Sequence, residues 1–268
     1  MADLIDMWGY KGKRVVINGA ATGMGAAATR MLLELGAEVY ALDIKEVTQP
    51  VKKYIATDLM RKESIDAALE KIPGNIDRVF TCAGIAGPPD PIIDVPIINF
   101  VGNRYMVDSL LPRVVEGGAI VMISSAVASG WQQRIDDIRP LLETQGFDEA
   151  VAWLEANPDS WEGVAEGYNI AKMCMIAYIK SKAWGLSERK IRINAISPGA
   201  TDTPMMVDFH AVSKEFVDLS LGPIGRYATP EEQAAPLVFL NSNMASYISG
   251  VNLVVDFGVI AEMEINLA

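Results

Sequence analysis

Near its N-terminus the chain reads Arg-Val-Val-Ile-Asn-Gly-Ala-Ala-Thr-Gly-Met-Gly over residues 14–25. The β-branched apolar run at its start predicts a buried strand over Arg14–Asn18, and helical periodicity follows over residues 23–35. Glycines at such a turn let the backbone approach a pyrophosphate, and the helix offers free N–H groups and the positive end of its dipole. A tight strand-to-helix joint without a ligand is the alternative. The segment therefore predicts a dinucleotide site that contains Gly19, Thr22, Gly23, Met24 and Gly25.

The rest of the chain alternates short β-rich runs with helical periods. Strands are predicted at 38–43, 53–56, 78–82, 119–124, 192–197 and 252–255, and helices at 63–71, 99–113, 168–186 and 230–240. This alternation indicates a parallel sheet with helices on both faces. Because crossover connections are right-handed, we expect one Rossmann-type, doubly wound α/β domain of about seven strands over residues 1–268. Its ligand should lie beyond the carboxyl ends of the strands.

The composition argues against several classes of protein. The formal net charge is −11 and no basic stretch is longer than a few residues, which argues against nucleic-acid binding. The first ten residues lack the layout of a signal peptide, and no apolar run approaches the length that spans a bilayer. Cys82 and Cys174 lie in apolar surroundings, which is typical of core thiols in a reducing compartment. We expect a cytoplasmic protein with no nucleic-acid or membrane partner and no metal site.

Tyr168 and Lys172 lie four residues apart in a predicted helix. This spacing places a phenol and an ammonium on one side of the helix, one turn apart. A free tyrosine has a pKa near 10, and a fixed cation beside it stabilises the phenolate and lowers that pKa. Such a tyrosine can pass a proton to or from an alcohol oxygen. A surface Tyr–Lys pair has the same spacing, so this interpretation depends on the nucleotide turn.

Asp43 ends the second predicted strand. A carboxylate at this place can accept hydrogen bonds from both ribose hydroxyls of an adenosine, and it would repel a 2′-phosphate. We therefore expect NAD in preference to NADP, with a simple turn residue as the alternative for Asp43. Asp58 and Leu59 follow the third predicted strand and are candidates to contact the adenine ring.

Six motifs in this order resemble the short-chain dehydrogenase/reductase family, over roughly residues 10–258. They are the turn Asn18–Gly25, the segment Thr81-Cys82-Ala83-Gly84, the set Asn99, Ser125, Tyr168 and Lys172, the pair Pro198-Gly199, the threonines Thr201 and Thr203, and Asp256-Phe257-Gly258. The family usually has Thr at Asn18, Asn at both Thr81 and Cys82, and Gly at Phe257. These departures affect backbone supports rather than reacting groups, and they indicate a divergent subgroup.

The resemblance implies the reacting groups. Tyr168 is expected to act as general acid in reduction and general base in oxidation, and Lys172 to lower its pKa and hold the nicotinamide ribose. Ser125, chosen over Ser124, is expected to hydrogen-bond the substrate oxygen. Asn99 is expected to hold a water that links Lys172 to solvent. The alternatives are a strand-end cap for Ser125 and backbone pairing for Asn99.

The resemblance also implies further cofactor contacts. Ala83, Gly84, Pro198 and Gly199 are expected to line the nucleotide site. Thr203, with Thr201 as second choice, is expected to bind the nicotinamide carboxamide, although either can equally form a turn with its own backbone. The single histidine, His210, has no place in this mechanism.

Two segments are expected to surround the substrate. Residues 200–225 should form a lid, and their Met205, Met206 and Phe209 suit a bulky apolar ligand or, alternatively, pack a helix. Residues 131–167 form an insertion with two short amphipathic helices, which either wall the pocket or cover the outer face where family members assemble. The second case predicts a homodimer in place of a homotetramer. Trp131 is a further candidate for substrate contact.

The short stretch after the fourth strand and the long insertion resemble the bacterial 3α-hydroxysteroid dehydrogenase/carbonyl reductase group and the coniferyl alcohol dehydrogenases. This resemblance implies an NAD-dependent dehydrogenase or carbonyl reductase acting on a hydrophobic secondary alcohol or its ketone. A coniferyl-type primary alcohol is one alternative, and a non-catalytic NAD-binding scaffold is another. Enoyl reductases space the Tyr and Lys further apart, and the related dehalogenases lose the dinucleotide turn, so neither is favoured.

Overall fold

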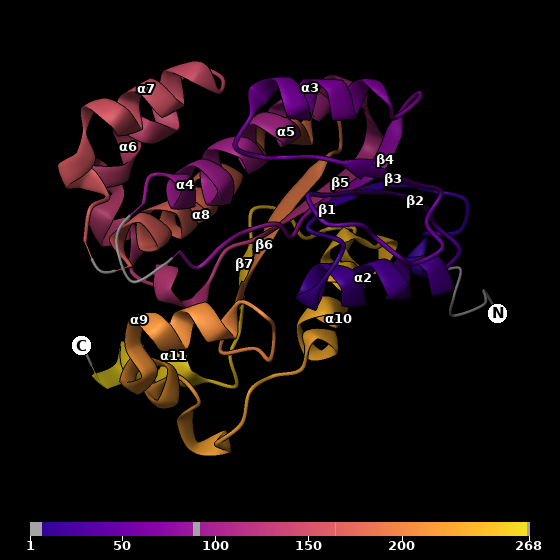
Figure 1. Ribbon diagram of the computed structural model, residues 1–268. Coiled ribbons are helices and arrows are strands. Elements are labelled where there is room, and N and C mark those ends of the chain that lie inside the picture. The colour runs from indigo at the N-terminus through magenta and orange to yellow at the C-terminus, as the bar shows by residue number, and fades with distance from the viewer. Residues whose placement is uncertain (1–6, 88–91, 164, 267–268) are drawn as a thin grey trace.

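The computed structural model describes residues 7–87, 92–163 and 165–266. Its centre is a sheet of seven strands in the order β3-β2-β1-β4-β5-β6-β7, and every neighbouring pair is parallel (Figure 1). The strands are β1 (Arg14–Asn18), β2 (Glu38–Asp43), β3 (Lys53–Ala56), β4 (Ile76–Thr81), β5 (Val114–Ile123), β6 (Arg192–Pro198) and β7 (Asn252–Val255). This confirms the Rossmann-type, doubly wound fold.

Helices cover both faces of the sheet (Figure 1). They are α2 (Gly23–Glu34), α3 (Lys62–Glu70), α4 (Asp94–Pro96), α5 (Asn103–Leu110), α6 (Ile135–Glu143), α7 (Asp148–Ala156), α8 (Glu166–Ser187), α9 (Met206–Leu219), α10 (Pro230–Asn241) and α11 (Val259–Asn266). In the described part of the chain, no helix has the length and apolar character needed to cross a bilayer.

The sequence of β1 shows why the sheet lies between two helical layers. Val15, Val16 and Ile17 are all fully buried, although successive side chains in a strand point to opposite faces. Val16 belongs to the apolar core shared with α3, α5 and α8, whereas Val15 and Ile17 belong to the core shared with α2 and α10. An apolar run without alternation therefore specifies a strand that is buried on both sides.

The helix expected at 99–113 is divided into several pieces. After α4 comes a π-helix, η1 (Ile97–Gly102), then α5, and then a 3₁₀ turn, η2 (Leu111–Arg113). The side-chain amide of Asn103 donates to the carbonyls of Ile98 and Asn99, at 2.9 and 3.3 Å. A side chain that inserts into the helical ladder in this way widens the turn. Apolar periodicity continues through such a turn, so the sequence alone did not reveal it.

The insertion forms the two expected helices, α6 and α7. Ile138 and Leu141 of α6 and Leu154 of α7 are fully buried and join the core that contains α8. Figure 1 shows both helices outside α4 and α8, away from the sheet. Of the two expected placements, the structure therefore shows the insertion covering the outer face of α8.

One buried cation ties this insertion to the body of the fold. Arg104 of α5 is 3% exposed, and its guanidinium donates to the carbonyls of Leu141 at 3.1 Å and Gly146 at 2.8 Å. It also donates to the hydroxyl of Thr144 at 3.0 Å. These acceptors lie at the end of α6 and in the turn before α7. A single planar donor group therefore holds the connection between the two inserted helices.

We expect Arg104→Met to lower the free energy of unfolding by about 2–3 kcal/mol, because hydrogen bonds to a charged group are lost and buried carbonyls are left without donors. Arg139→Met is the matched control, since that side chain is 54% exposed and forms a surface ion pair. Denaturant unfolding measures both. Equal stability of the two variants would contradict the role given to Arg104.

Candidate active site

The glycine-rich turn lies where the strand order reverses, between β1 and β4. Gly19 has a φ of +67°, and a Cβ atom there would stand 2.6 Å from the Cα of Ala83. A Cβ on Gly25 would lie 2.8 Å from the carbonyl carbon of Gly19. Neither Gly19 nor Gly25 has room for a side chain, so the backbone of the turn is uncovered at both positions. Such a cradle fits the close approach of a pyrophosphate.

The N-terminus of α2 completes this cradle. Thr22 is the N-cap residue, and among the described contacts its side chain forms no capping hydrogen bond. Gly23 has a φ of +55°, and a Cβ there would lie 3.2 Å from Cγ2 of Thr203. Met24 is half-buried and packs on the core beneath α2. The start of the lid segment therefore lies directly against the first turn of the helix.

Asp43 lies at the carboxyl end of β2, as expected. Its Oδ2 accepts a hydrogen bond of 2.9 Å from the backbone N–H of Ala21, and its Oδ1 accepts one of 2.9 Å from that of Lys45. The carboxylate thus supports the glycine-rich turn, and each of its oxygens retains further acceptor capacity. Asp43 can therefore stabilise the turn, which was the alternative expected for it, and still accept hydrogen bonds from a ribose.

Asp58 and Leu59 lie beyond β3 but face different surroundings. The carboxylate of Asp58 accepts a hydrogen bond of 2.9 Å from the N–H of Met60. Leu59 is only 6% exposed and lies against Gly102 of η1. Little of the leucine side chain is therefore open to an adenine ring, and its main contribution is to the core.

Asn18 supplies the support that the sequence lacks at Thr81 and Cys82. Its Oδ1 accepts hydrogen bonds from the N–H groups of Cys82 at 2.8 Å and Ala83 at 2.9 Å. Its Nδ2 donates to Oδ1 of Asn103 at 2.8 Å. The departure at Asn18 therefore compensates for the two departures in the following motif. Burial raises the pKa of the Cys82 thiol, which favours its neutral form.

Asn99 continues this network toward the catalytic helix. Its side-chain amide is fully buried, accepts from the N–H of Ile85 and donates to the carbonyl of Ile85, both at 2.8 Å. A Cβ on Gly84 would lie 2.8 Å from Oδ1 of Asn99 and 3.7 Å from Nζ of Lys172. The Asn99 side chain therefore pairs with the backbone of the loop after β4, and not with its own helix as the alternative expected. The pairing holds the Gly84 backbone between Asn99 and Lys172.

The structure brings Tyr168, Lys172 and Ser125 together. Nζ of Lys172 lies 5.4 Å from the centre of the Tyr168 ring and donates to the carbonyl of Ile123 at 3.0 Å. Ser125 lies beside the phenol of Tyr168 and lowers the pKa of that phenol. The hydroxyl of Ser124 instead donates to the backbone carbonyl of Lys172 at 2.7 Å. Ser125 is thus the serine that faces the phenol.

The expected effect of Lys172 on Tyr168 is wrong for the protein without a bound nucleotide. Burial raises the pKa of Tyr168 to about 12, and Ser125 only partly opposes this. Burial also lowers the pKa of Lys172 to about 8. The reason is that both groups are removed from water, which disfavours the phenolate and the ammonium alike. The two side chains share one side of the helix, but burial is the main cause of the shift in each pKa.

The segment after β6 closes the far side of the crevice. Gly199 follows Pro198, and a Cβ at this glycine would lie 2.9 Å from Cβ of Asp256. The hydroxyl of Thr201 donates to the carbonyl of Gly199 at 2.9 Å and is buried. Thr203 is half-exposed and faces the glycine-rich turn. The geometry therefore favours Thr203 over Thr201 as a residue available to a ligand.

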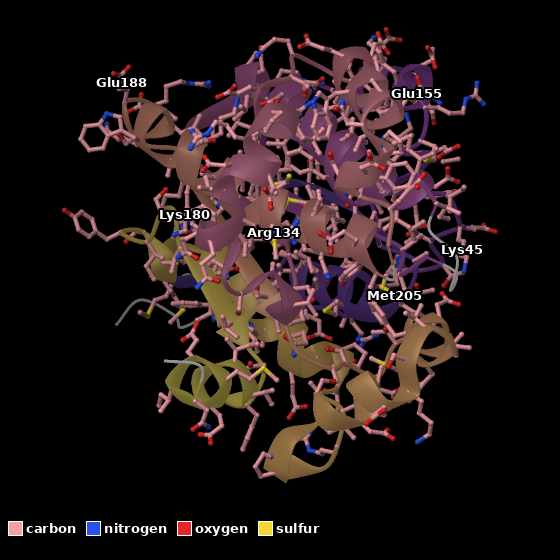
Figure 2. The ribbon with its side chains drawn as sticks, turned by 90° about the vertical axis from the view of Figure 1, so that its left-hand side faces the viewer. Lys45, Arg134, Glu155, Lys180, Glu188 and Met205 are labelled. Carbon is pink, nitrogen blue, oxygen red and sulfur yellow. The ribbon has the colours of Figure 1, made fainter. Side chains whose placement is uncertain are left out.

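Of the candidate substrate residues, Phe209 lies against the phenol of Tyr168. The ring of Phe209 packs edge-on against that of Tyr168, with centroids 5.2 Å apart and an interplanar angle of 87°. Trp131 is half-buried against the core at the start of the insertion. Figure 2 shows Met205 and Lys45 on one side of the molecule and Glu188, which follows α8, on the opposite side. The lid and the end of β2 thus share one edge of the sheet. Met206 begins α9 and is half-exposed.

Sequence reasoning missed Asn103 and the pair formed by His210 and Tyr227. Asn103 is a buried amide that connects Asn18 to η1. A polar residue in an apolar helical period was its only signal. Nε2 of His210 lies 2.8 Å from the hydroxyl of Tyr227, seventeen residues away, and nothing in the sequence indicates this contact.

Comparison with known proteins identifies the family of this chain. A family model for short chain dehydrogenases matches residues 13–134, and a model described as enoyl-(acyl carrier protein) reductase matches residues 154–260. A coniferyl-alcohol dehydrogenase from Pseudomonas sp. is 30% identical over 92% of this chain and 96% of its own length. A 3-alpha-hydroxysteroid dehydrogenase/carbonyl reductase from Comamonas testosteroni is 31% identical over 93% and 97%.

Solved structures have the same fold. The 3-alpha-hydroxysteroid dehydrogenase from Pseudomonas sp. B-0831, complexed with NADH, aligns with a TM-score of 0.75 and 24% identity. The alignment covers 94% of this chain and 98% of that one. A 3-ketoacyl-(acyl-carrier-protein) reductase from Brucella melitensis, also complexed with NADH, aligns with a TM-score of 0.70 and 25% identity over 93% and 99%.

We expect Gly19→Ala to destabilise the fold by about 2 kcal/mol more than Gly12→Ala, because only at Gly19 does the added methyl group meet backbone. Gly12 is the matched control, since its φ is +70° and no atom lies within 4 Å of its hypothetical Cβ. Both variants carry the same cost of a left-handed backbone. Denaturant unfolding of both variants measures the difference. Equal losses would show that the approach to Ala83 is unimportant.

Proposed function

Because the chain belongs to the short-chain dehydrogenase/reductase family, we propose that it is an NAD(H)-dependent oxidoreductase for a hydrophobic secondary alcohol and its ketone. The observation that carries this proposal is the phenol of Tyr168. Ser125 lies beside it, and the Nζ atom of Lys172, one helical turn away, is 5.4 Å from the centre of its ring. The substrate class proposed is steroid-like, terpenoid or aryl.

The proposed chemistry of the chain is proton transfer. In reduction the hydroxyl of Tyr168 donates its proton to the carbonyl oxygen, and in oxidation its phenolate accepts the alcohol proton. The hydroxyl of Ser125 holds the same oxygen and stabilises charge that develops there. NAD, when bound, supplies the hydride chemistry. Lys172 is proposed to hold the nicotinamide ribose and Asn99 a water, in line with the resemblance set out above.

The proposed preference for NAD depends on Asp43. The residues proposed to hold the dinucleotide are the turn at Gly19–Gly25, Asp43, Asp58, Leu59, Ala83, Gly84, Tyr168, Lys172, Pro198, Gly199, Thr201 and Thr203. A carboxylate at the end of β2 accepts from ribose hydroxyls and repels a 2′-phosphate. Two solved structures with this fold are NADH complexes, which is consistent with this choice.

The proposed substrate is apolar because of what faces Tyr168. Phe209 lies against the phenol, and Met205, Met206 and Trp131 are the other candidates near the mouth. Flexible Met side chains and aromatic rings suit a bulky hydrocarbon body. A coniferyl-type primary alcohol is the second candidate, which the 30% identical coniferyl-alcohol dehydrogenase favours. A non-catalytic NAD-binding scaffold is a third candidate, and NAD binding without turnover of any alcohol would point to it.

The proposed assembly is a homodimer rather than a homotetramer. The insertion lies over α4 and α8, the outer face through which we expected family members to associate (Figure 1). A surface covered by α6 and α7 is not free to pack against a second copy. A homotetramer of this kind needs two different symmetric interfaces, and with this one blocked only a homodimer can form.

We expect Tyr168→Phe to lower kcat at least about a hundredfold while the affinity for NAD changes less than about twofold, because only the proton-transfer group is removed. Steady-state assays at the NADH absorbance band with secondary alcohols measure kcat, and a direct titration measures NAD binding. The control is Tyr178→Phe, which removes a buried hydroxyl of the same helix that donates to Asp108 at 2.8 Å. Normal turnover by Tyr168→Phe would falsify the proposed chemistry.

We expect Asp43→Ala to shift the ratio of kcat/KM for NAD over that for NADP toward NADP by about tenfold or more, because a carboxylate that would face the 2′-phosphate is removed. Glu46→Ala is the matched control, since it removes an equal charge from an exposed position nearby. Assays with both cofactors give the ratio. An unmodified protein that already prefers NADP would defeat the argument from Asp43.

A further inference from the structure

The first half of α9 closes over the phenol of Tyr168. Tyr168 is 8% exposed, and the ring of Phe209 lies against it at 5.2 Å. A substrate oxygen must come within hydrogen-bond distance of the phenol to exchange a proton. A bulky substrate therefore requires Phe209, and the helix that carries it, to move aside.

The neighbouring residue holds the same helix from another direction. Nε2 of His210 and the hydroxyl of Tyr227 lie 2.8 Å apart and share a hydrogen bond. Their rings are nearly perpendicular, at 87°, with centroids 6.2 Å apart. Consecutive helical residues point about 100° apart, so Phe209 and His210 contact different parts of the protein. His210 is the single histidine of the chain, and the proposed chemistry does not use it.

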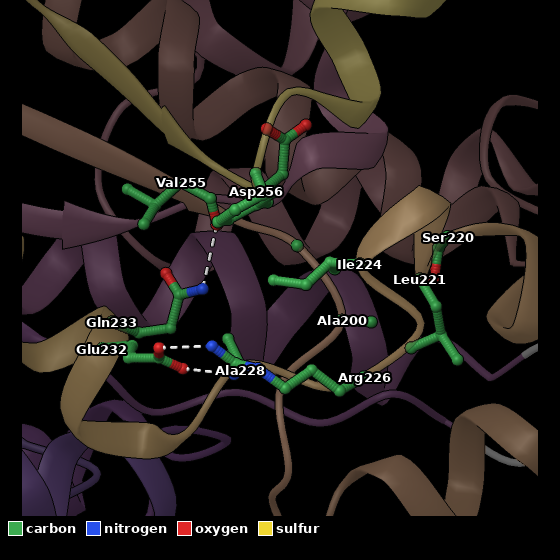
Figure 3. A pocket seen from close by; sticks show the side chains of 12 residues that line it. Ala200, Ser220, Leu221, Ile224, Arg226, Ala228, Glu232, Gln233, Val255 and Asp256 are labelled. Carbon is green, nitrogen blue, oxygen red and sulfur yellow. Dashed lines mark hydrogen bonds and ion pairs between the residues drawn. The ribbon is translucent and has the colours of Figure 1, made fainter.

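Tyr227 stands on a segment that is tied to the body of the fold. Its neighbour Arg226 forms a two-pronged ion pair with Glu232 of α10, with both N–O distances at 2.7 Å (Figure 3). On its other side, the N–H of Ala228 donates to the carbonyl of Ala200 at 2.9 Å. Glu232 also closes the capping box of α10 with Thr229. The tyrosine is therefore a fixed post, because Arg226 is bound to α10 and Ala228 to Ala200, and both anchors lie outside residues 206–212.

The half of α9 that bears Phe209 and His210 is separated from the rest. Ser213 has φ −160° and ψ 98°, which interrupts the helix and leaves residues 206–212 as one unit. The segment beyond α9 borders a cavity of about 110 Å³, lined in part by Ala200, Leu221 and Ile224 (Figure 3). Incomplete packing there gives the far end of the lid room to shift.

We propose that the hydrogen bond between His210 and Tyr227 is the latch of the substrate lid. It holds residues 206–212 against the fixed post, and its rupture lets Phe209 leave the phenol and admit the substrate. His210 and Tyr227 are thus positioning residues, which act on the substrate through Phe209. This inference rests on the proposed function, since it takes Tyr168 as the group that meets the substrate.

The direct test is backbone amide hydrogen exchange of the protein without ligands, in Tyr227→Phe, His210→Phe and the double variant. Each single variant should speed exchange over residues 206–212 about fivefold, the effect of losing one neutral hydrogen bond, with no change over 230–241. The double variant should exchange no faster than either single one, because both remove the same bond. Tyr247→Phe is the control, since that side chain is fully exposed.

Kinetics with 1-phenylethanol and NAD provide a readout that a merely structural role would not move. Both single variants should lower KM for the alcohol about fivefold, with kcat equal or higher and the dissociation constant of NAD within twofold. Only the open lid admits the substrate, so a weaker latch raises the population of the state that binds the alcohol.

Unchanged exchange over residues 206–212 in either single variant, or additive effects in the double variant, would overturn the latch. A fall in kcat with unchanged KM would also overturn it. Amide hydrogen exchange needs no substrate, so it tests the proposed latch even if the protein turns over no alcohol. Failure of the proposed function is judged separately, by Tyr168→Phe.

Discussion

The close contact between the first turn and the end of the fourth strand is the constraint on which the site depends. Gly19 meets the backbone of Ala83 without a side chain between them, at the point where the strand order reverses. The side chain of Asn18 fixes this contact by accepting two N–H groups from the adjoining segment. Asn103 and Asn99 extend the same network to Gly84, whose backbone lies against Lys172. Three buried amides thus connect the nucleotide cradle to the catalytic helix.

Burial, rather than the pairing of charges, sets the protonation of the reacting groups before a nucleotide binds. The phenol of Tyr168 is neutral at physiological pH because burial raises its pKa to about 12. Lys172 is close to its titration point, since burial lowers its pKa to about 8. A neutral phenol is the form that donates a proton in reduction. Oxidation requires the phenolate, so the positive charge that accompanies the oxidised cofactor has to favour it.

The sequence was sufficient where local chemistry alone decides the structure. The glycine turn, the apolar strands and the capping signals of α10 are recognisable because each requires particular residue types at fixed spacing. The placement of Asp43 also followed from its position at a strand end, whereas the choice of Ser125 followed from the family resemblance. The site as a set of functional residues remains a prediction, because the structure gives their arrangement and not their activity.

Other features depend on contacts between distant segments. The π-helix needs Asn103 to reach the carbonyls of Ile98 and Asn99, and apolar periodicity gives no sign of this. The hydrogen bond of His210 with Tyr227 and the four acceptors of Arg104 are likewise set by tertiary packing. In the protein without a nucleotide, burial raises the pKa of Tyr168, and spacing on a helix indicates proximity to Lys172 but not the burial of both groups.

The most direct test is the pH dependence of kcat for alcohol oxidation with saturating NAD, measured for the unmodified protein and for Lys172→Met. If Tyr168 moves the proton beside Lys172, the unmodified protein should show one titrating group with a pKa below about 10, the ordinary value for tyrosine. In Lys172→Met this group should titrate at a higher pH, toward the value of about 12 that burial imposes on Tyr168. The same profile in both proteins would contradict the pairing of the phenol with the ammonium.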